Sequence, residues 1–274
     1  MKNQDQMLGM IAGNRRFPIL FAQAAKKHGV KKLVAVAFVG ETEPELEKFV
    51  DAIEWVKLGK LNDLVGRFKK HGVEKVVMVG QIAPKNLFAR VSLDVRMTML
   101  LAKLRTKNAE SIFGAIGREI AKDGLSLVPH AHYVGEAIPK KGVLTQRKPT
   151  KEQEQDIKFG RRIGGSIAAL DIGQTVVIKR GTVLAVEAFE GTDEALLRGG
   201  RLAGDERGAV AVKVSKPGQD MRFDIPDIGE TTIETARKAE LSVLAFEAGK
   251  TLLLERDQIV RLEDKHGICL MAFE

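Results

Sequence analysis

Two stretches of the sequence, VLAVEAFEGTD at residues 183–193 and KVSKPGQDMRFDIPDIG at residues 213–229, set the organisation of this chain. Each opens with an apolar run typical of a buried strand and then breaks, at Gly191 or at Pro217-Gly218, into a segment rich in carboxylates, hydroxyls and amides. Acidic loops at strand ends suit a site that binds a metal ion and phosphate groups. The spacing matches no named metal signature, so two solvated acidic turns are the alternative interpretation.

The sequence before these stretches alternates short apolar runs with amphipathic segments, which predicts a parallel sheet covered by helices on both faces. Strands are expected at 8–12, 33–38, 55–58, 76–79 and 125–128, and helices at 17–28, 44–50, 60–71, 95–106 and 109–123. The pattern indicates a Rossmann-like N-terminal domain at residues 1–133.

The later sequence predicts a second α/β domain at residues 151–274, built on a mixed sheet. A hairpin is expected at 174–186, turning at Arg180-Gly181. Further helices are expected at 152–170, 192–203, 231–241 and 256–264, and strands at 209–214, 243–247, 251–255 and 268–273. Residues 134–150, rich in glycine, proline and lysine, are expected to link the two domains.

The composition favours a globular protein with anionic partners. The chain has 274 residues, of which 44% are hydrophobic, and a formal net charge of +8. A phosphorylated small molecule or an acidic membrane surface fits this charge. Nucleic acid is disfavoured, because one Trp and one Tyr offer few stacking platforms. The sequence lacks an apolar run of 18 residues and a signal-peptide core, so we expect a cytoplasmic protein.

Two loops of the N-terminal half are candidate ligand loops. Residues 13–18, GNRRFP, join a strand to a helix, where backbone amides and the side chains of Arg15 and Arg16 would receive a phosphate. The loop lacks the G-x-G-x-x-G pattern, which disfavours NAD. A second loop begins at Gly80, and because both follow parallel strands, they should face one site. Plain turns are the alternative.

Asp224 is the strongest candidate for an essential acid. It stands between Phe223 and Ile225-Pro226, a stiff apolar context that would hold its carboxylate in one orientation. Hydrolysis of a diphosphate needs a divalent cation and a group that prepares the attacking hydroxide. Mg²⁺ prefers carboxylates, water and substrate oxygens, so Asp224 is also a candidate metal ligand.

Other polar residues have weaker signals. Glu187 and Glu190 cannot share a face of a regular strand, so one of them is expected to form a structural salt bridge. Thr192 is expected to cap the helix that follows. His130 and His132 are interpreted as polar surface or linker residues rather than metal ligands, because no carboxylate cluster adjoins them.

Four stretches resemble the LpxI family of UDP-2,3-diacylglucosamine pyrophosphatases, which act in lipid A biosynthesis. They read IAGNRRFP at 11–18, VLAVEAFEGTD at 183–193, KPGQD at 216–220 and DIPDIG at 224–229. The similarity extends over nearly the whole chain. Two positions depart from the family pattern: Arg15 stands where a glycine is usual, and residues 107–110 replace a Gly-Asp-Asp-like segment.

The resemblance implies Mg²⁺-dependent hydrolysis of UDP-2,3-diacylglucosamine to UMP and 2,3-diacylglucosamine 1-phosphate. It implies a cytoplasmic homodimer at the surface of the inner membrane, with the diphosphate between the two domains and an acyl-chain cleft within or beside the C-terminal domain. Asp224 is the expected catalytic residue. The expected substrate-binding residues are Gly13, Asn14, Gly80, Glu190, Gly191, Thr192, Asp193, Lys213, Lys216, Gln219 and Asp220.

Two other functions stay open. The Rossmann-like half would also suit a nucleotide-sugar transferase or an oxidoreductase, although the missing glycine pattern weighs against NAD. The basic charge would also suit a non-catalytic protein that binds nucleotide or lipid.

Overall fold

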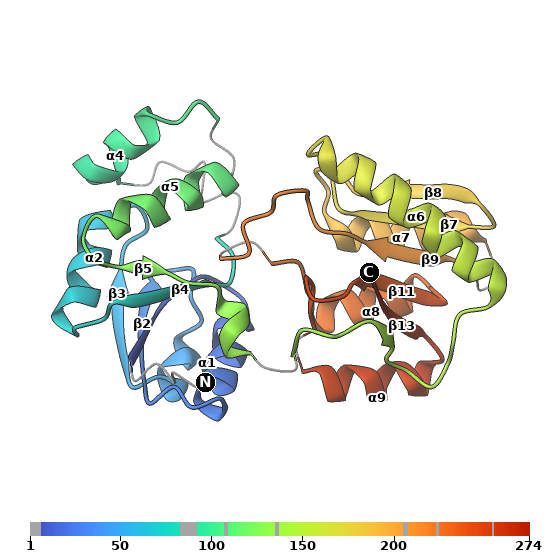
Figure 1. Cartoon of the computed structure of the whole chain (residues 1–274), viewed down its shortest axis with the longest axis horizontal. Coiled ribbons are helices and arrows are strands. Elements are labelled where there is room, and N and C mark those ends of the chain that lie inside the picture. The colour runs from blue at the N-terminus through green and yellow to red at the C-terminus, as the bar shows by residue number, and fades with distance from the viewer. Residues whose placement is uncertain are drawn as a thin grey trace. The chain divides into compact units, whose positions relative to one another are not determined.

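The computed structural model describes residues 7–82, 92–106, 109–134, 137–204, 208–222, 225–253 and 255–274 (Figure 1). The chain forms two compact units. Unit 1 contains the residues up to 135 together with 220–224, and unit 2 contains 136–219 and 225–274. A short segment from late in the sequence therefore belongs to the unit that the N-terminal half builds.

Unit 1 has a five-stranded parallel sheet in the order β3-β2-β1-β4-β5. Its strands are β1 (Met7–Ala12), β2 (Lys32–Phe38), β3 (Ala52–Val56), β4 (Lys75–Val79) and β5 (Ser126–Leu127). Its helices are α1 (Phe17–Lys27), α2 (Leu61–Lys70), α4 (Val95–Ala102) and α5 (Ala109–Ala121), with 3-10 turns η1 (Pro44–Phe49) and η2 (His130–Tyr133). The parallel Rossmann-like sheet that the sequence predicts is confirmed.

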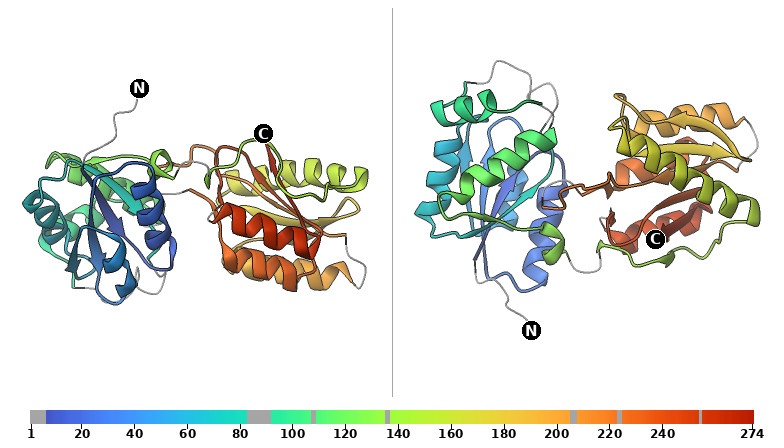
Figure 2. Two further views of the ribbon diagram at one scale, coloured as in Figure 1. Left: turned by 90° about the horizontal axis from the view of Figure 1, so that it is seen from below. Right: turned by 45° about the horizontal axis from the view of Figure 1, so that its top comes forward.

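Both faces of this sheet are covered, because its strands are almost wholly apolar. One face packs against α2, α4 and α5 in a core that includes Val36, Phe68 and Ile120. Figure 2 shows α1 on the opposite side of the sheet from α2. Pro18 lies in the first turn of α1, where its fixed φ and missing N–H suit a helix start.

Unit 2 has a six-stranded mixed sheet in the order β6-β13-β11-β9-β7-β8. Its strands are β6 (Gly142–Val143), β7 (Thr175–Lys179), β8 (Thr182–Val186), β9 (Val210–Lys213), β11 (Val243–Glu247) and β13 (Cys269–Phe273). Strands β9, β11 and β13 are parallel, whereas β6, β7 and β8 pair with antiparallel neighbours. A small separate sheet joins β10 (Asp227–Ile228) to β12 (Leu252–Leu253).

The helices of unit 2 cover both faces of its main sheet. Helix α6 (Lys151–Ala169) packs on one face, and α7 (Thr192–Ala203), α8 (Glu230–Lys238) and α9 (Arg256–His266) pack on the other. A capping box between Thr150 and Gln153 fixes the start of α6. Buried Asp156 accepts the backbone N–H groups of Arg180 and Gly181, which holds the predicted hairpin turn in place.

Most expected elements are present, and the differences are local. The helix expected at 44–50 is the 3-10 turn η1, and strand β10 was not predicted because two residues carry too little pattern. Within the segment expected to link the domains, residues 142–143 form β6 and pair with β13.

Candidate active site

The acidic loops of unit 2 meet at one edge of its sheet. Strands β9, β11 and β13 end at this edge, β7 begins there, and β8 ends there. Residue 174, the loop 187–193 and the loop that begins at 214 therefore lie at the same edge. In open α/β sheets, ligands bind outside the carboxyl ends of parallel strands, so this edge is the candidate active site of unit 2.

Thr192 is the centre of a hydrogen-bond network at this edge. Its Oγ1 donates to Glu187 Oε1 over 3.1 Å and accepts from Lys213 Nζ over 3.2 Å. Thr175 Oγ1 lies 3.5 Å from the same hydroxyl. The sequence predicted that Thr192 caps α7, but the cap residue is Gly191, and α7 begins at Thr192 itself. The Thr192 hydroxyl therefore bonds to side chains at the edge of the sheet instead of capping the backbone of α7.

Two buried acceptors beside this network are unsatisfied. Among the described residues, Asp193 Oδ1 and Gln174 Oε1 have no hydrogen-bond partner. A buried acceptor without a partner has lost its hydrogen bonds to water and gained none in the protein, which destabilises the folded state. Such groups are therefore rare in folded proteins. Their position next to Thr192 and Thr175 suits a ligand that brings donors or a cation to the edge.

The two glutamates of the first acidic stretch have different roles. Glu190 Oε1 pairs with Arg198 Nη2 over 2.7 Å, and its other oxygen accepts the N–H of Ala188 over 3.2 Å. Glu187 instead receives the Thr192 hydroxyl. One of the two was expected to form a structural salt bridge, and Glu190 is that residue, which leaves Glu187 at the ligand edge.

The second acidic stretch begins as an ordered basic loop. Gln219 Oε1 accepts the N–H of Lys216 over 2.8 Å, and Lys216 Nζ pairs with Asp171. The N–H of Ser215 donates to Glu247 Oε2 over 2.7 Å. Within the part of the chain that the structure describes, Gln219 Nε2 and Ser215 Oγ are buried and lack a partner.

Asp220 belongs to the segment that clusters with unit 1. Its carboxylate pairs with the guanidinium of Arg222, with Nη2 and Oδ2 2.6 Å apart. This guanidinium lowers the pKa of Asp220 below its usual range. The charge of Asp220 is thus already balanced within the loop. Phe223 and Asp224 lie outside the described residues, and the role of Asp224 stays a prediction.

The two candidate loops of unit 1 are joined through their backbones. The N–H of Gly13 donates to Val79 O, and that of Asn14 to Gln81 O, each over 2.7 Å. A Cβ on Gly13 would lie 2.4 Å from Gln81 O, and one on Gly80 would lie 2.8 Å from Asn14 O. Only glycine permits this approach, so the two loops lie side by side, as their positions after neighbouring parallel strands predict.

Asn14 and Arg15 show how this loop is held. Asn14 Nδ2 donates to Glu41 Oε2 over 2.9 Å, while its buried Oδ1 has no partner among the residues that the structure describes. Arg15 has a φ of 64°, in the left-handed region that favours glycine. The glycine that the family resemblance led us to expect at this position would adopt this conformation without strain.

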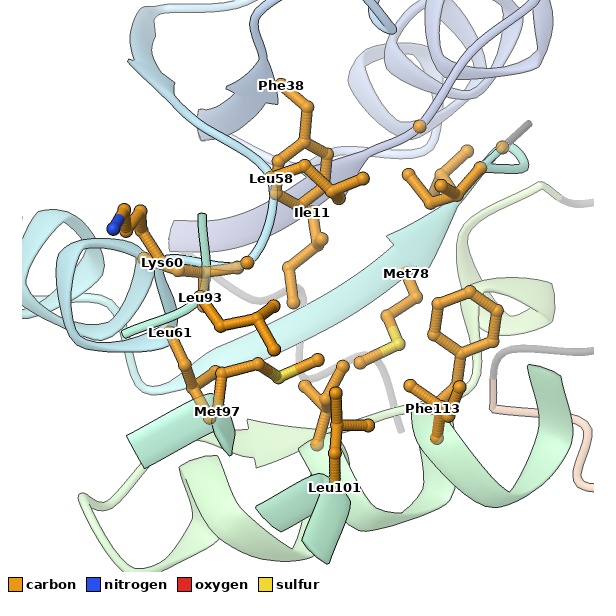
Figure 3. A pocket seen from close by; sticks show the side chains of 18 residues that line it. Ile11, Phe38, Leu58, Lys60, Leu61, Met78, Leu93, Met97, Leu101 and Phe113 are labelled. Carbon is orange, nitrogen blue, oxygen red and sulfur yellow. The ribbon is translucent and has the colours of Figure 1, made fainter. Parts of the chain in front are cut away.

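An apolar cavity of about 170 Å³ opens beside these loops (Figure 3). It lies between β1, β2, β4, α2, α4 and α5, and Gly13 and Gly80 form part of its wall. Figure 3 shows Met78, Met97 and Leu101 projecting into it. Among the described residues of its lining, Lys60 is the one charged side chain. The sequence led us to expect an apolar cleft within or beside the C-terminal domain, whereas this cavity lies in unit 1.

His130 was interpreted as a polar surface or linker residue, which is wrong. Its side chain is 2% exposed, and its ring packs edge-on against Phe17, with the centroids 5.4 Å apart. Burial lowers the pKa of His130 to about 4, although backbone groups of Arg222 and Met78 oppose this effect. The ring is therefore a neutral core group at pH 7.

The described residues do not include a group of three or more His, Cys, Asp or Glu side chains that would hold a metal ion. Glu187 and Asp193 are the acidic side chains nearest this network, and Glu187 already accepts the Thr192 hydroxyl. The described part of the site does not by itself fit a protein-held metal centre.

The chain matches two protein-family models along nearly its whole length. The LpxI N-terminal domain matches residues 7–137, and the LpxI C-terminal domain matches residues 140–271. A relative named UDP-2,3-diacylglucosamine pyrophosphatase LpxI, from Caulobacter vibrioides, is 28% identical over 276 residues, which are 97% of each chain.

Two further similarities are partial. Ribosomal protein uS12 methylthiotransferase RimO of Kineococcus radiotolerans is 28% identical over 131 residues, 46% of this chain and 26% of that protein. The biotin carboxylase domain of Hydrogenobacter thermophilus 2-oxoglutarate carboxylase is 12% identical, with a TM-score of 0.28. That match covers 65% of this chain and 35% of the solved chain, and a TM-score of this size supports no conclusion.

Proposed function

This chain belongs to the LpxI family, and from that membership we propose that it hydrolyses UDP-2,3-diacylglucosamine to UMP and 2,3-diacylglucosamine 1-phosphate in lipid A biosynthesis. The observation that carries the proposal is the similarity to the Caulobacter pyrophosphatase over 97% of both chains. The physical properties of each unit are consistent with a substrate that has acyl chains at one end and phosphates at the other.

The cavity of unit 1 suits an acyl chain. Its walls are almost entirely aliphatic, aromatic or thioether groups, and the backbones of Gly13 and Gly80 form part of them. Apolar pockets with a few polar groups at the mouth are typical of sites for lipid-like ligands. We infer that part of one acyl chain occupies this cavity.

The edge of unit 2 suits the polar end of the substrate. Lys213 and Lys216 supply positive charge, and the unsatisfied oxygens of Gln174 and Asp193 would accept donors from a sugar or a hydrated cation. Preorganised charges and dipoles of this kind stabilise a developing phosphate charge. Thr192 orients both Glu187 and Lys213, so we propose that it fixes their positions for the substrate.

We propose that Asp224 is the essential acid and that the reaction requires Mg²⁺. Mg²⁺ is commonly held by one or two carboxylates together with substrate phosphates, so a complete protein cage is not required. When bound, the ion would supply charge to the diphosphate. Treatment with EDTA should abolish turnover, and Mg²⁺ should restore it. Full activity in EDTA would contradict the proposed metal requirement but not the proposed hydrolysis.

The test of the proposed function is turnover of purified UDP-2,3-diacylglucosamine, with both products identified by mass spectrometry. The expected result is UMP and 2,3-diacylglucosamine 1-phosphate in equal amounts. If the protein binds the substrate but does not hydrolyse it, the result would instead support the non-catalytic alternative. Reaction in heavy-oxygen water should label the sugar 1-phosphate, because we propose that Arg15 and Arg16 hold the nucleotide and that UMP leaves.

We also propose that the protein is cytoplasmic, homodimeric and peripherally associated with an anionic membrane. The described helices include none long and apolar enough to cross a membrane, and the net charge of +8 favours an anionic surface. Light scattering after gel filtration measures the oligomeric state. Flotation with anionic liposomes at low and high salt measures membrane association, which should weaken as salt rises.

A further inference from the structure

Three apolar side chains are exposed at the active-site edge of unit 2. Phe189 is 102% exposed, Leu170 is 70% exposed and Ile172 is 46% exposed. Phe189 lies in the loop between β8 and α7, and the other two lie in the loop between α6 and β7. We call these three residues the apolar tip.

The two loops of the apolar tip lie directly against each other. A Cβ on Gly173 would lie 2.0 Å from the carbonyl oxygen of Glu187, and the N–H of Gln174 donates to Glu187 Oε2 over 3.4 Å. This contact places the ends of both loops at one edge. The three exposed side chains therefore come from two loops that are in contact with each other.

A basic groove lies on the same side of the sheet as α6. It has a volume of about 620 Å³, and its cationic lining residues are Lys158, Arg161, Arg162, Lys216 and Lys250. Glu247 is the acidic side chain of that lining, among the residues that the structure describes. The pairing of Lys216 with Asp171 connects the groove to the apolar tip, because Asp171 stands between Leu170 and Ile172.

The groove also contains an unused polar group. Ser215 lines it, is 8% exposed, and its Oγ has no hydrogen-bond partner in the described part of the chain. The backbone N–H of Ser215 is already bonded to Glu247, so the hydroxyl is available to a ligand. Cations around a buried hydroxyl suit the oxygens of a phosphate group.

We propose that the apolar tip and the basic groove together dock unit 2 on an anionic phospholipid surface, with the tip among the acyl chains and the groove on a lipid phosphate. Exposed aromatic and aliphatic side chains beside cations are the features of interfacial membrane binding. Three side chains are too few for a stable protein interface, which needs about 800 Å² from each partner. The inference rests on the proposed function, since a substrate that is a membrane lipid must reach this edge.

The test compares four variants for binding to phosphatidylglycerol–phosphatidylcholine vesicles without substrate. The first replaces Leu170, Ile172 and Phe189 by Ser, and the second is Lys158→Gln with Arg162→Gln. The third, Leu202→Ser, is the matched control, because Leu202 is 57% exposed at the other end of α7. The fourth, Asp224→Ala, carries an intact docking surface.

The tip variant should bind at least about tenfold more weakly, because burial of a single Phe or Leu side chain changes a partition constant by about that factor. The charge variant should bind about tenfold more weakly at low salt and show a smaller dependence on salt. Leu202→Ser and Asp224→Ala should bind like the unmodified protein. Circular dichroism checks that each variant is folded.

Turnover separates docking from chemistry. The tip variant should lose activity on substrate embedded in vesicles and keep it on substrate dispersed in detergent. If the unmodified protein binds vesicles but hydrolyses nothing, the proposed function fails and the docking surface stands. Equal vesicle binding by the tip variant and the unmodified protein would overturn the docking proposal. Dissociation of a dimer by the tip substitutions would also overturn it, in favour of a second copy as the occupant.

Discussion

The two ligand edges of this molecule are built in opposite ways. In unit 1, backbone hydrogen bonds and glycines hold the loops at Gly13 and Gly80 together, and the space beside them is apolar. In unit 2, side-chain hydrogen bonds around Thr192 hold the edge, and buried polar atoms there lack partners within the described chain. Loops held by their backbones keep a fixed shape, but few residues other than glycine fit at the close contacts. An edge held by side chains presents charged groups, and a single substitution can remove one of its hydrogen bonds. The difference matches a substrate with an apolar and a polar end.

The largest expected effect is at Asp224. Asp224→Ala should lower kcat about a hundredfold or more, because loss of a group that prepares water or holds a metal affects the transition state. Steady-state kinetics with saturating Mg²⁺ measures this loss. Glu154→Ala is the control, because Glu154 is exposed near the start of α6, away from the site edge. A folded Asp224→Ala protein with near-normal kcat would show that hydrolysis does not require this carboxylate.

The pH dependence of stability should also distinguish the two units. Glu263 of α9 is fully buried, its carboxylate has no hydrogen-bond partner among the described residues, and burial raises its pKa to about 7. The folded state therefore binds a proton that the unfolded state releases as the pH rises from about 4.5. Unit 2 should lose about 3 kcal/mol of stability between about pH 4.5 and 7, and little more above that range.

Glu263→Gln should remove this loss and stabilise unit 2 at pH 8 by a similar amount. Hydrogen exchange of the amides in α9 and in β1 at pH 5 and pH 8 measures the two units separately. His130 of unit 1 shifts in the opposite sense, because burial lowers its pKa from 6.5 to about 4, so unit 1 should gain stability as the pH rises from about 4 to 6.5. Equal pH dependence in both units, or none in either, would contradict the assignment to Glu263.

The backbone scaffold of unit 1 is tested by Gly13→Ala. The new Cβ would lie 2.4 Å from Gln81 O, so the loops must separate, at a cost of about 2 kcal/mol. Gly66→Ala is the matched control, because Gly66 lies within α2 and a Cβ there meets nothing within 4 Å. The control should be neutral or stabilising by up to about 1 kcal/mol. Chemical denaturation measures both variants, and equal stabilities would show that the loops are not held by close approach.

The side-chain network of unit 2 is tested by Thr192→Val. Loss of the hydroxyl removes the bonds to Glu187 and Lys213 and should lower kcat/KM about fivefold to tenfold, the effect of about 1 kcal/mol. Thr192→Ser keeps the hydroxyl and should retain most activity. If Thr192→Val keeps the kcat/KM of the unmodified protein while Thr192→Ser loses it, the methyl group rather than the hydroxyl is what matters.

The smallest effect is expected at Arg15. Arg15→Gly should remove the strain of a φ of 64° and stabilise unit 1 by up to about 1 kcal/mol. The gain is offset in part, because glycine makes the unfolded chain more flexible. The same change should raise KM if Arg15 holds the nucleotide. Thermal unfolding and substrate titration together separate the two contributions, and an unchanged KM would remove Arg15 from the proposed site.

The sequence by itself determined the fold class and most elements, because strand and helix periodicities are local properties. The apolar run of β2 and the amphipathic pattern of α2 can be recognised from their own residues, without knowledge of what packs against them. The start of α7 is marked by Gly191 and Thr192. The resemblance also identified the acidic stretches. Their meeting at one edge follows from the parallel order of β9, β11 and β13.

Only the tertiary structure decided which polar groups are paired and which are left without a partner at the candidate site. Periodicity cannot show that Glu190 pairs with Arg198 while Glu187 contacts Thr192, because both partners come from another element. The burial of His130 likewise depends on Phe17 from α1, more than a hundred positions away in the sequence. The cavity of unit 1 is formed by six elements that meet only after folding. Local pattern fixes where strands and helices begin, but burial and pairing depend on how folding places the elements against one another.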